Sequence, residues 1–179
     1  MRAILVLFDS LNRLAVGAYG GKLKTPNFDR FAERAFSFDS HYVGSLPCMP
    51  ARRDMQTGRH AFLHRSWGPL EPFDNSFPEL MKAAGAYSHL ISDHYHYWED
   101  GGATYHSRYN SFEFIRGQES DPWKVMLTTP IDRIREKYHP SQNDLSSKQN
   151  PYNYMINREF IKEEKDFPSV QCFKAAFDY

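Results

Sequence analysis

The chain has 179 residues, of which 41% are hydrophobic and 25% are charged. This is the composition of an ordinary folded domain, and the length is sufficient for the core of one. Lys and Arg together number 22, as do Asp and Glu, so no net charge attracts nucleic acid or an anionic membrane. We therefore expect neither as a partner, and any preference for anions must be local.

The cysteines and the first residues bear on the compartment. Cys48 and Cys172 are too few for a disulfide framework, and neither belongs to a CxxC pair that would indicate structural zinc. The apolar run over residues 1–8 is too short for a signal peptide or a membrane span. The default expectation is a cytoplasmic protein.

The first third of the chain predicts two strands and a helix. Residues 3–8 are continuously apolar, which predicts a central parallel strand buried on both faces and ending at Asp9. Ligands gather at the carboxyl ends of such strands, so Asp9 is placed for metal or substrate work, unless it only caps a short helix over residues 11–16. A helix should begin at Thr25-Pro26-Asn27, and residues 36–43 should form a second strand.

The stretch Pro47-Cys48-Met49-Pro50-Ala51-Arg52-Arg53 carries the strongest chemical signal. Pro50 suits a first helical turn, so Cys48 should lie at or just before the start of a helix that ends at Thr57, with Gly58 as its C-cap. Free backbone N–H groups and the helix dipole favour a thiolate there, and Arg52 adds a cation. The alternative is a buried cysteine that acts as a small apolar residue.

The rest of the chain predicts an alternation of helices and strands. A helix is expected over residues 77–84 and a parallel strand over 87–92, followed by a polar, aromatic loop with His94 and His96. Beyond it we expect a strand over 111–115, a helix over 131–137, a loop through 140–151 and a final helix over 168–179. Residues 103–166 are interpreted as an excursion that shapes a substrate pocket.

Several motifs occur in the order found in type I sulfatases, which the chain resembles over about its first 100 residues. They are Asp9 after a short strand, Gly17-x-Tyr19-Gly20, Thr25-Pro26-Asn27-x-Asp29-Arg30-Phe31-Ala32, Cys48-x-Pro50-x-Arg52 and Thr57-Gly58-Arg59. The resemblance implies an α/β fold of the alkaline phosphatase superfamily, with a mostly parallel central sheet flanked by helices. Residues 1–179 would be the N-terminal part of a single catalytic domain.

The resemblance also implies a function, namely hydrolysis of sulfuric esters, with a small-molecule or carbohydrate sulfate ester as substrate. A maturation enzyme would oxidise Cys48 to formylglycine, the nucleophile and a metal contact. Asp9 would be a further ligand of a divalent cation, with calcium preferred over magnesium or manganese because the donors are hard oxygens. Arg52 would brace the formylglycine, and His94 and His96 would contact the sulfuryl group or protonate the leaving group.

Two departures from the family pattern leave alternatives open. Ser10 stands where many sulfatases have a second aspartate, as in phosphonate monoester hydrolases of the same superfamily, so a phosphonate or phosphodiester substrate is an alternative. The later metal pair of the family is missing from these residues. We therefore expect this stretch alone to be catalytically incomplete, or else to be an inactive binding module.

Overall fold

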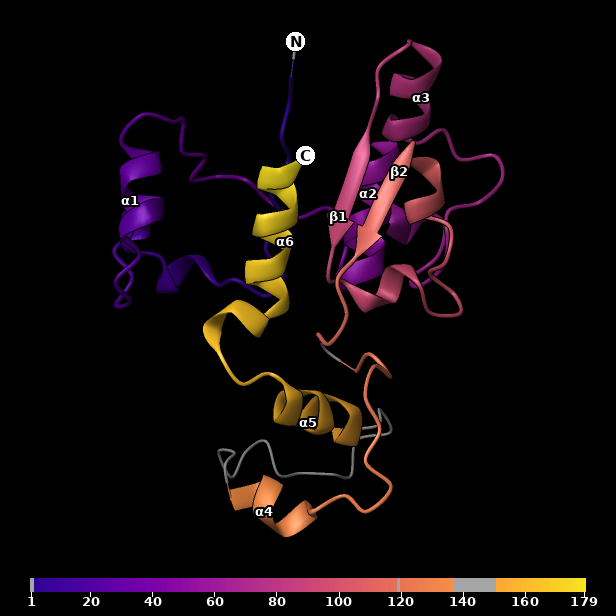
Figure 1. The fold of residues 1–179 in the computed structure, drawn as a ribbon. Coiled ribbons are helices and arrows are strands. Elements are labelled where there is room, and N and C mark those ends of the chain that lie inside the picture. The colour runs from indigo at the N-terminus through magenta and orange to yellow at the C-terminus, as the bar shows by residue number, and fades with distance from the viewer. Residues whose placement is uncertain (1, 119, 137–150) are drawn as a thin grey trace.

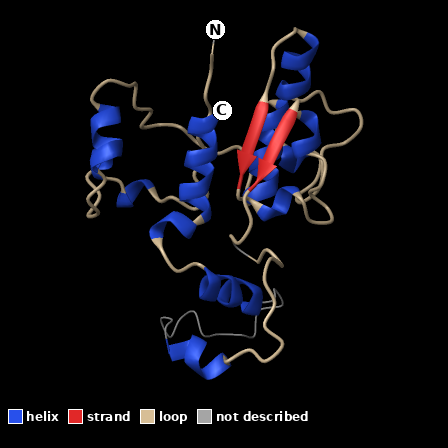
Figure 2. Cartoon of the chain, viewed as in Figure 1, coloured by secondary structure: helices blue, strands red, loops and turns tan. Residues whose placement is uncertain are grey.

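A computed structural model describes residues 2–118, 120–136 and 151–179. Helices dominate these residues, and the two strands lie together on one side of the molecule (Figures 1 and 2). Short 3-10 turns join several of the elements. The elements are α1 (Pro26–Ala32), α2 (Cys48–Thr57), α3 (Phe77–Ala83), β1 (His89–Ser92), β2 (Ser111–Phe114), α4 (Ile131–Glu136), α5 (Pro151–Phe160) and α6 (Pro168–Asp178).

The sheet is small and parallel. Within the described residues it consists of β1 and β2, paired from His89 opposite Ser111 to Ser92 opposite Phe114. Helices accompany it, as the α/β expectation requires, and α6 lies beside β1 (Figure 1). The connection from β1 to β2 runs through 3-10 turns rather than an α-helix.

Both strands predicted in the first third of the chain are wrong for this structure. Residues 3–8 and 36–43 contain no strand, and Ile4 is 89% exposed where a buried position was expected. A strand is defined by hydrogen bonds to a neighbour, and in the described part of the chain no strand pairs with either segment. Apolar composition alone therefore led to the wrong secondary structure.

The helix predictions hold better because local signals specify both ends. Helix α2 ends at Gly58, which adopts a left-handed conformation with φ 67°. Helix α3 begins with a capping box in which Ser76 and Glu79 satisfy each other's backbone N–H groups. Helices α1, α4 and α6 also lie where they were expected.

Two predictions on the second half have other outcomes. Helix α5 was not predicted, since its residues fall in the segment interpreted as an excursion. The loop expected over 140–151 lies almost entirely outside the described residues.

The buried core packs against the first turn of α2. Its members are Met49, Leu70, Tyr97 and Tyr105, with Met49 and Tyr105 fully buried. The Tyr105 hydroxyl lies 3.2 Å from the carbonyl oxygen of Gly68 and 3.4 Å from that of Met49, and it donates to both. Because Met49 follows Cys48 directly, this core fixes the backbone that carries the thiol. Among the described residues, no helix is long and apolar enough to cross a bilayer.

Candidate active site

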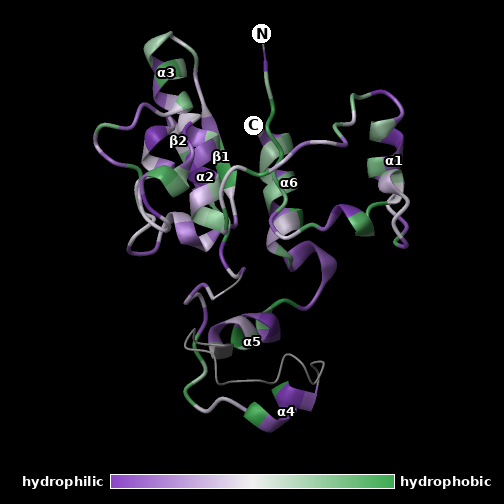
Figure 3. Ribbon diagram, turned by 180° about the vertical axis from the view of Figure 1, so that it is seen from behind, coloured by the Kyte–Doolittle hydropathy of each residue, from purple (hydrophilic) through white to green (hydrophobic). Residues whose placement is uncertain are grey.

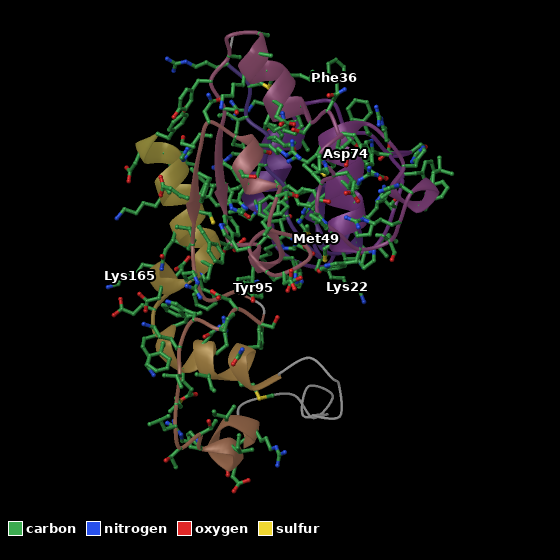
Figure 4. All side chains as sticks on the ribbon, turned by 90° about the vertical axis from the view of Figure 1, so that its right-hand side faces the viewer. Lys22, Phe36, Met49, Asp74, Tyr95 and Lys165 are labelled. Atoms are coloured by element: carbon green, nitrogen blue, oxygen red, sulfur yellow. The ribbon has the colours of Figure 1, made fainter. Side chains whose placement is uncertain are left out.

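Cys48 is the first residue of α2, and a buried ion pair anchors this helix. Arg53 donates two hydrogen bonds to Asp74, at 2.7 and 3.2 Å, and both side chains are buried. Figure 4 labels Asp74 and Met49 in the part of the molecule built around α2. Two residues that follow Cys48 in α2, Met49 and Arg53, are therefore held by the protein interior.

Asp9 lies next to Cys48 although 39 residues separate them along the chain. Its Oδ1 is 4.0 Å from the Cys48 Sγ and accepts a 2.9 Å hydrogen bond from the Ser10 hydroxyl. Ser10 has a φ of 55°, a left-handed conformation that is uncommon for residues other than glycine. The sequence analysis treated Ser10 only as a missing ligand, and it gave no sign that this hydroxyl orients Asp9.

Arg52 holds the other oxygen of Asp9. Its Nη2 is 3.0 Å from Oδ2, and the side chain of Arg52 is only 9% exposed. Burial on its own raises the pKa of Asp9, but the Ser10 hydroxyl, the Arg52 guanidinium and nearby His94 outweigh it, so the pKa lies below 3.8. The sequence analysis assigned Arg52 to bracing formylglycine; in the structure the guanidinium contacts the neighbouring carboxylate.

His94 completes a cluster of three donor groups. It lies at the beginning of the loop that leaves β1, and its Nδ1 is 3.6 Å from the Asp9 Oδ2. One ligand atom each from Asp9, Cys48 and His94 lies within 4.8 Å of the other two. Three segments that are distant in the sequence thus meet at one point.

His96 lies next to His94. The two rings are 5.1 Å apart and nearly perpendicular. The Nδ1 of His96 is 2.7 Å from a carboxylate oxygen of Glu99, and the Trp67 ring meets His96 at 88°. The sequence analysis missed both neighbours. Glu99 stands three residues from His96, a spacing that could have signalled the pair.

The backbone of this loop differs from the prediction. The two histidines were expected to face one ligand because extended residues two apart point the same way, but Tyr95–Tyr97 forms a 3-10 turn with His94 as its N-cap. Gly102 packs directly on the carbonyl of His96, where a Cβ atom has no room. A 3-10 turn, unlike extended backbone, does not point residues two apart to the same side.

The donor set fits a divalent cation without selecting one. The carboxylate of Asp9 suits calcium, magnesium or manganese, whereas the imidazole of His94 suits zinc and its neighbours better. The thiol of Cys48 occupies the place that a formylglycine oxygen would take. The Oδ1 of Asp9 is the oxygen directed toward residue 48, since Oδ2 is held by Arg52.

Comparisons with known proteins indicate the family of the chain. The family model described as Sulfatase matches residues 2–165. A multifunctional alkaline phosphatase superfamily protein, PehA of Trinickia caryophylli, is 38% identical over 64 residues, or 36% of this chain and 12% of its own. Arylsulfatase J of Mus musculus is 27% identical over 97 residues, 49% of this chain and 16% of its own. The matches thus span less than a fifth of either relative, and no solved structure matches significantly.

Proposed function

The chain belongs to the sulfatase family, and we propose that it carries the nucleophile of a sulfuric ester hydrolase. One observation supports this best: Asp9, Cys48 and His94 bring their ligand atoms within 4.8 Å of one another at the N-terminus of α2. A helix N-terminus with buried arginines beside it favours bound anions. A sulfate ester is such an anion.

In this proposal Cys48 acts after conversion to formylglycine by a maturation enzyme. The hydrated aldehyde would supply a hydroxyl that attacks sulfur and displaces the alcohol of the ester, and a second hydroxyl whose deprotonation would expel sulfate and restore the aldehyde. A divalent cation, with calcium as the first choice, would be held by Asp9 and residue 48 and would offset charge on the sulfuryl oxygens. The further ligands that calcium requires would come from outside the residues described.

The other side chains have roles that follow from their contacts. Arg52 keeps Asp9 ionised, since a guanidinium 3.0 Å away opposes protonation of the carboxylate. His94 borders the same carboxylate and would contact the sulfuryl group. His96, held by Glu99, would deliver a proton to the departing alcohol.

A second candidate function is hydrolysis of phosphonate monoesters or phosphodiesters. It is favoured by Ser10, which takes the place of a second carboxylate and so lowers the negative charge at the site. Tetrahedral phosphoryl and sulfuryl groups differ mainly in charge, so the number of carboxylates bears directly on this preference.

Turnover of two substrates with the same leaving group tests the proposal. With the full-length protein co-expressed with a maturation enzyme, we expect hydrolysis of an aryl sulfate to exceed that of the matching aryl phosphonate monoester. Cys48→Ala should abolish both activities. Cys172→Ala should change neither, because burial and the nearby acids Asp93 and Glu113 raise the pKa of Cys172 to about 12 and keep it an inert thiol.

Two results would count against this assignment. A faster reaction with the phosphonate would favour the second candidate function. Sulfate ester turnover that survives Cys48→Ala would exclude residue 48 as the nucleophile.

A further inference from the structure

An open cavity lies at the opposite end of α2 from Cys48. It has a volume of about 390 Å³, within the range of small-molecule sites. Every charged or protonatable side chain in its lining is basic, and the remaining side chains are apolar. The lining residues are Arg53, Gly58, Arg59, His60, Leu63, His64 and Phe73.

Arg59 is the basic residue of this lining that can pair with a bound anion. Arg53 is committed to the buried Asp74, at 2.7 Å. His60 lies 3.7 Å from Asp54. Arg59 is exposed, and among the described residues no carboxylate lies within ion-pair distance of its guanidinium.

His64 has a carboxylate partner as well, since its Nε2 is 3.3 Å from Glu71. Glu71 is shared, because Arg65 approaches the same oxygen at 2.8 Å. The carboxylates of this region therefore serve the other basic groups, and none of them lines the cavity. An anion that enters meets the guanidinium of Arg59 without a competing negative side chain in the lining.

An apolar wall stands beside Arg59. Leu63 is 77% exposed and Phe73 is 63% exposed, so both offer apolar surface to a ligand. The ring of His64 meets that of Phe73 edge to face at 5.8 Å, which extends the wall. A guanidinium next to an apolar wall suits a molecule with an acidic group on an apolar body.

The cavity is separate from the cluster around Cys48. Gly58 and Arg59 follow the last residue of α2, and a helix of ten residues at 1.5 Å each is about 15 Å long. The C-terminal end of a helix is slightly negative and does not attract anions. Binding there must therefore depend on the Arg59 side chain.

We propose that this cavity is a binding site for an organic anion, one that carries a sulfonate, sulfate or carboxylate on an apolar or aromatic body. Arg59 pairs with the acidic group, and Phe73 and Leu63 cover the body. The site is distinct from the reacting centre and does not depend on the function proposed for Cys48.

Titration with naphthalene-2-sulfonate, followed by the fluorescence of the probe, tests the site. Arg59→Gln should weaken binding at least tenfold, and Phe73→Ala should weaken it severalfold. Arg34→Gln is the matched control, an exposed arginine on another part of the chain, and should leave binding unchanged. The melting temperature of each variant verifies its fold.

Other measurements separate this site from the candidate active site. Cys48→Ala and His94→Ala should bind the probe like the wild type, and NOEs should connect the probe's ring protons to Phe73 and Leu63. Unchanged affinity in Arg59→Gln would overturn the proposal, as would loss of binding in the Cys48 and His94 variants. Inorganic sulfate that binds as tightly as the probe would refute the role of the apolar wall.

Discussion

Glu99 and Trp67 hold the ring of His96 from two sides. The carboxylate of Glu99 accepts from Nδ1 at 2.7 Å, so in the proposed mechanism Nε2 would be the ring atom that serves the substrate. The edge contact with Trp67 limits rotation of the ring. Partners of this kind fix the tautomer of a functional histidine. At metal sites, the loss of such a partner lowers metal affinity or activity by about ten- to a hundredfold, and we expect an effect of the same order here.

Glu99→Gln tests this arrangement. If His96 protonates the leaving group, the variant should lower kcat about tenfold for an unactivated alkyl or phenyl sulfate and much less for 4-nitrophenyl sulfate, whose leaving group needs no proton. KM should stay unchanged. Glu113→Gln, which alters the His89–Glu113 pair at 3.5 Å on the sheet, is the control. Equal losses with both substrates would indicate a purely structural role for Glu99.

The buried pair of Arg53 and Asp74 makes stability depend on pH. Burial alone raises the pKa of Asp74, but the backbone N–H of Glu71 and the guanidinium of Arg53 outweigh it and hold the pKa below 3.8. A carboxylate whose pKa is lowered by folding stabilises the folded state at every pH above the pKa that it has in the unfolded chain, about 3.9. That contribution is lost as the pH falls through the lower value of the native state.

Asp74→Asn should therefore lower the free energy of unfolding at pH 7, by about 3 kcal/mol, because it leaves Arg53 buried without a countercharge. It should also flatten the dependence of stability on pH below about 4. Urea unfolding at pH 7 and at acidic pH measures both effects. Asp39→Asn, in an exposed surface pair, should change neither. A variant as stable as the wild type at pH 7 would show that the pair does not anchor α2.

Among the elements, α2 was predicted best because residues at its own two ends determine where it begins and ends. Proline in its first turn and glycine after its last residue act through the backbone itself, independently of the rest of the fold. Gly58 is left-handed, with φ 67°, and a Cβ atom there would meet nothing within 4 Å. The need for glycine at this position is thus purely conformational.

Gly58→Ala should destabilise the protein by about 1 kcal/mol, since an alanine in the left-handed region costs about that much and no steric clash adds to it. Thermal or urea unfolding measures the change. Ala51→Gly, inside the same helix, should cost a similar amount through lost helix propensity. A loss several times larger in Gly58→Ala would mean that the end of α2 is constrained by more than its backbone.

The strands predicted over 87–92 and 111–115 are confirmed by β1 and β2, whereas the two strands predicted earlier in the chain and the extended backbone predicted for the loop after β1 are wrong. Residues 3–8 are apolar, but the structure leaves them exposed and without a paired strand among the described residues. No pattern of apolar residues encodes the turn over Tyr95–Tyr97 or the close approach of Gly102 to the carbonyl of His96. The predicted site residues Asp9, Cys48 and Arg52 do lie together in the structure. Their proximity could be predicted because an ordered set of family motifs carries information that hydrophobic periodicity does not.

At the scale of the whole molecule, the site residues come from two parts of the structure, one well packed and the other largely exposed to solvent. Cys48 and His94 belong to the part built around α2 and the sheet, whereas Asp9 follows an apolar arm over residues 4–8 that lies at the surface (Figure 3). The ring of Phe8 lies 5.4 Å from Phe28 and 6.1 Å from Phe173. These contacts with α1 and α6 hold Asp9 against the N-terminus of α2.

The matches to the two relatives span only 12% and 16% of the relatives' own lengths. We propose that the missing metal ligands and the cover for the apolar arm are provided by structure outside the residues described. Asp9 would then be positioned as firmly as Cys48. The maturation of residue 48 is the step on which the whole mechanism depends.

Peptide mass spectrometry of residue 48 tests that step most directly. After co-expression with a formylglycine-generating enzyme, the peptide that contains residue 48 should show the mass of an aldehyde in place of the thiol and should react with a hydrazide. Its conversion should rise in parallel with turnover of an aryl sulfate, while Cys172 stays a thiol in the same sample. An unmodified Cys48 in protein that hydrolyses sulfate esters at full rate would contradict the mechanism.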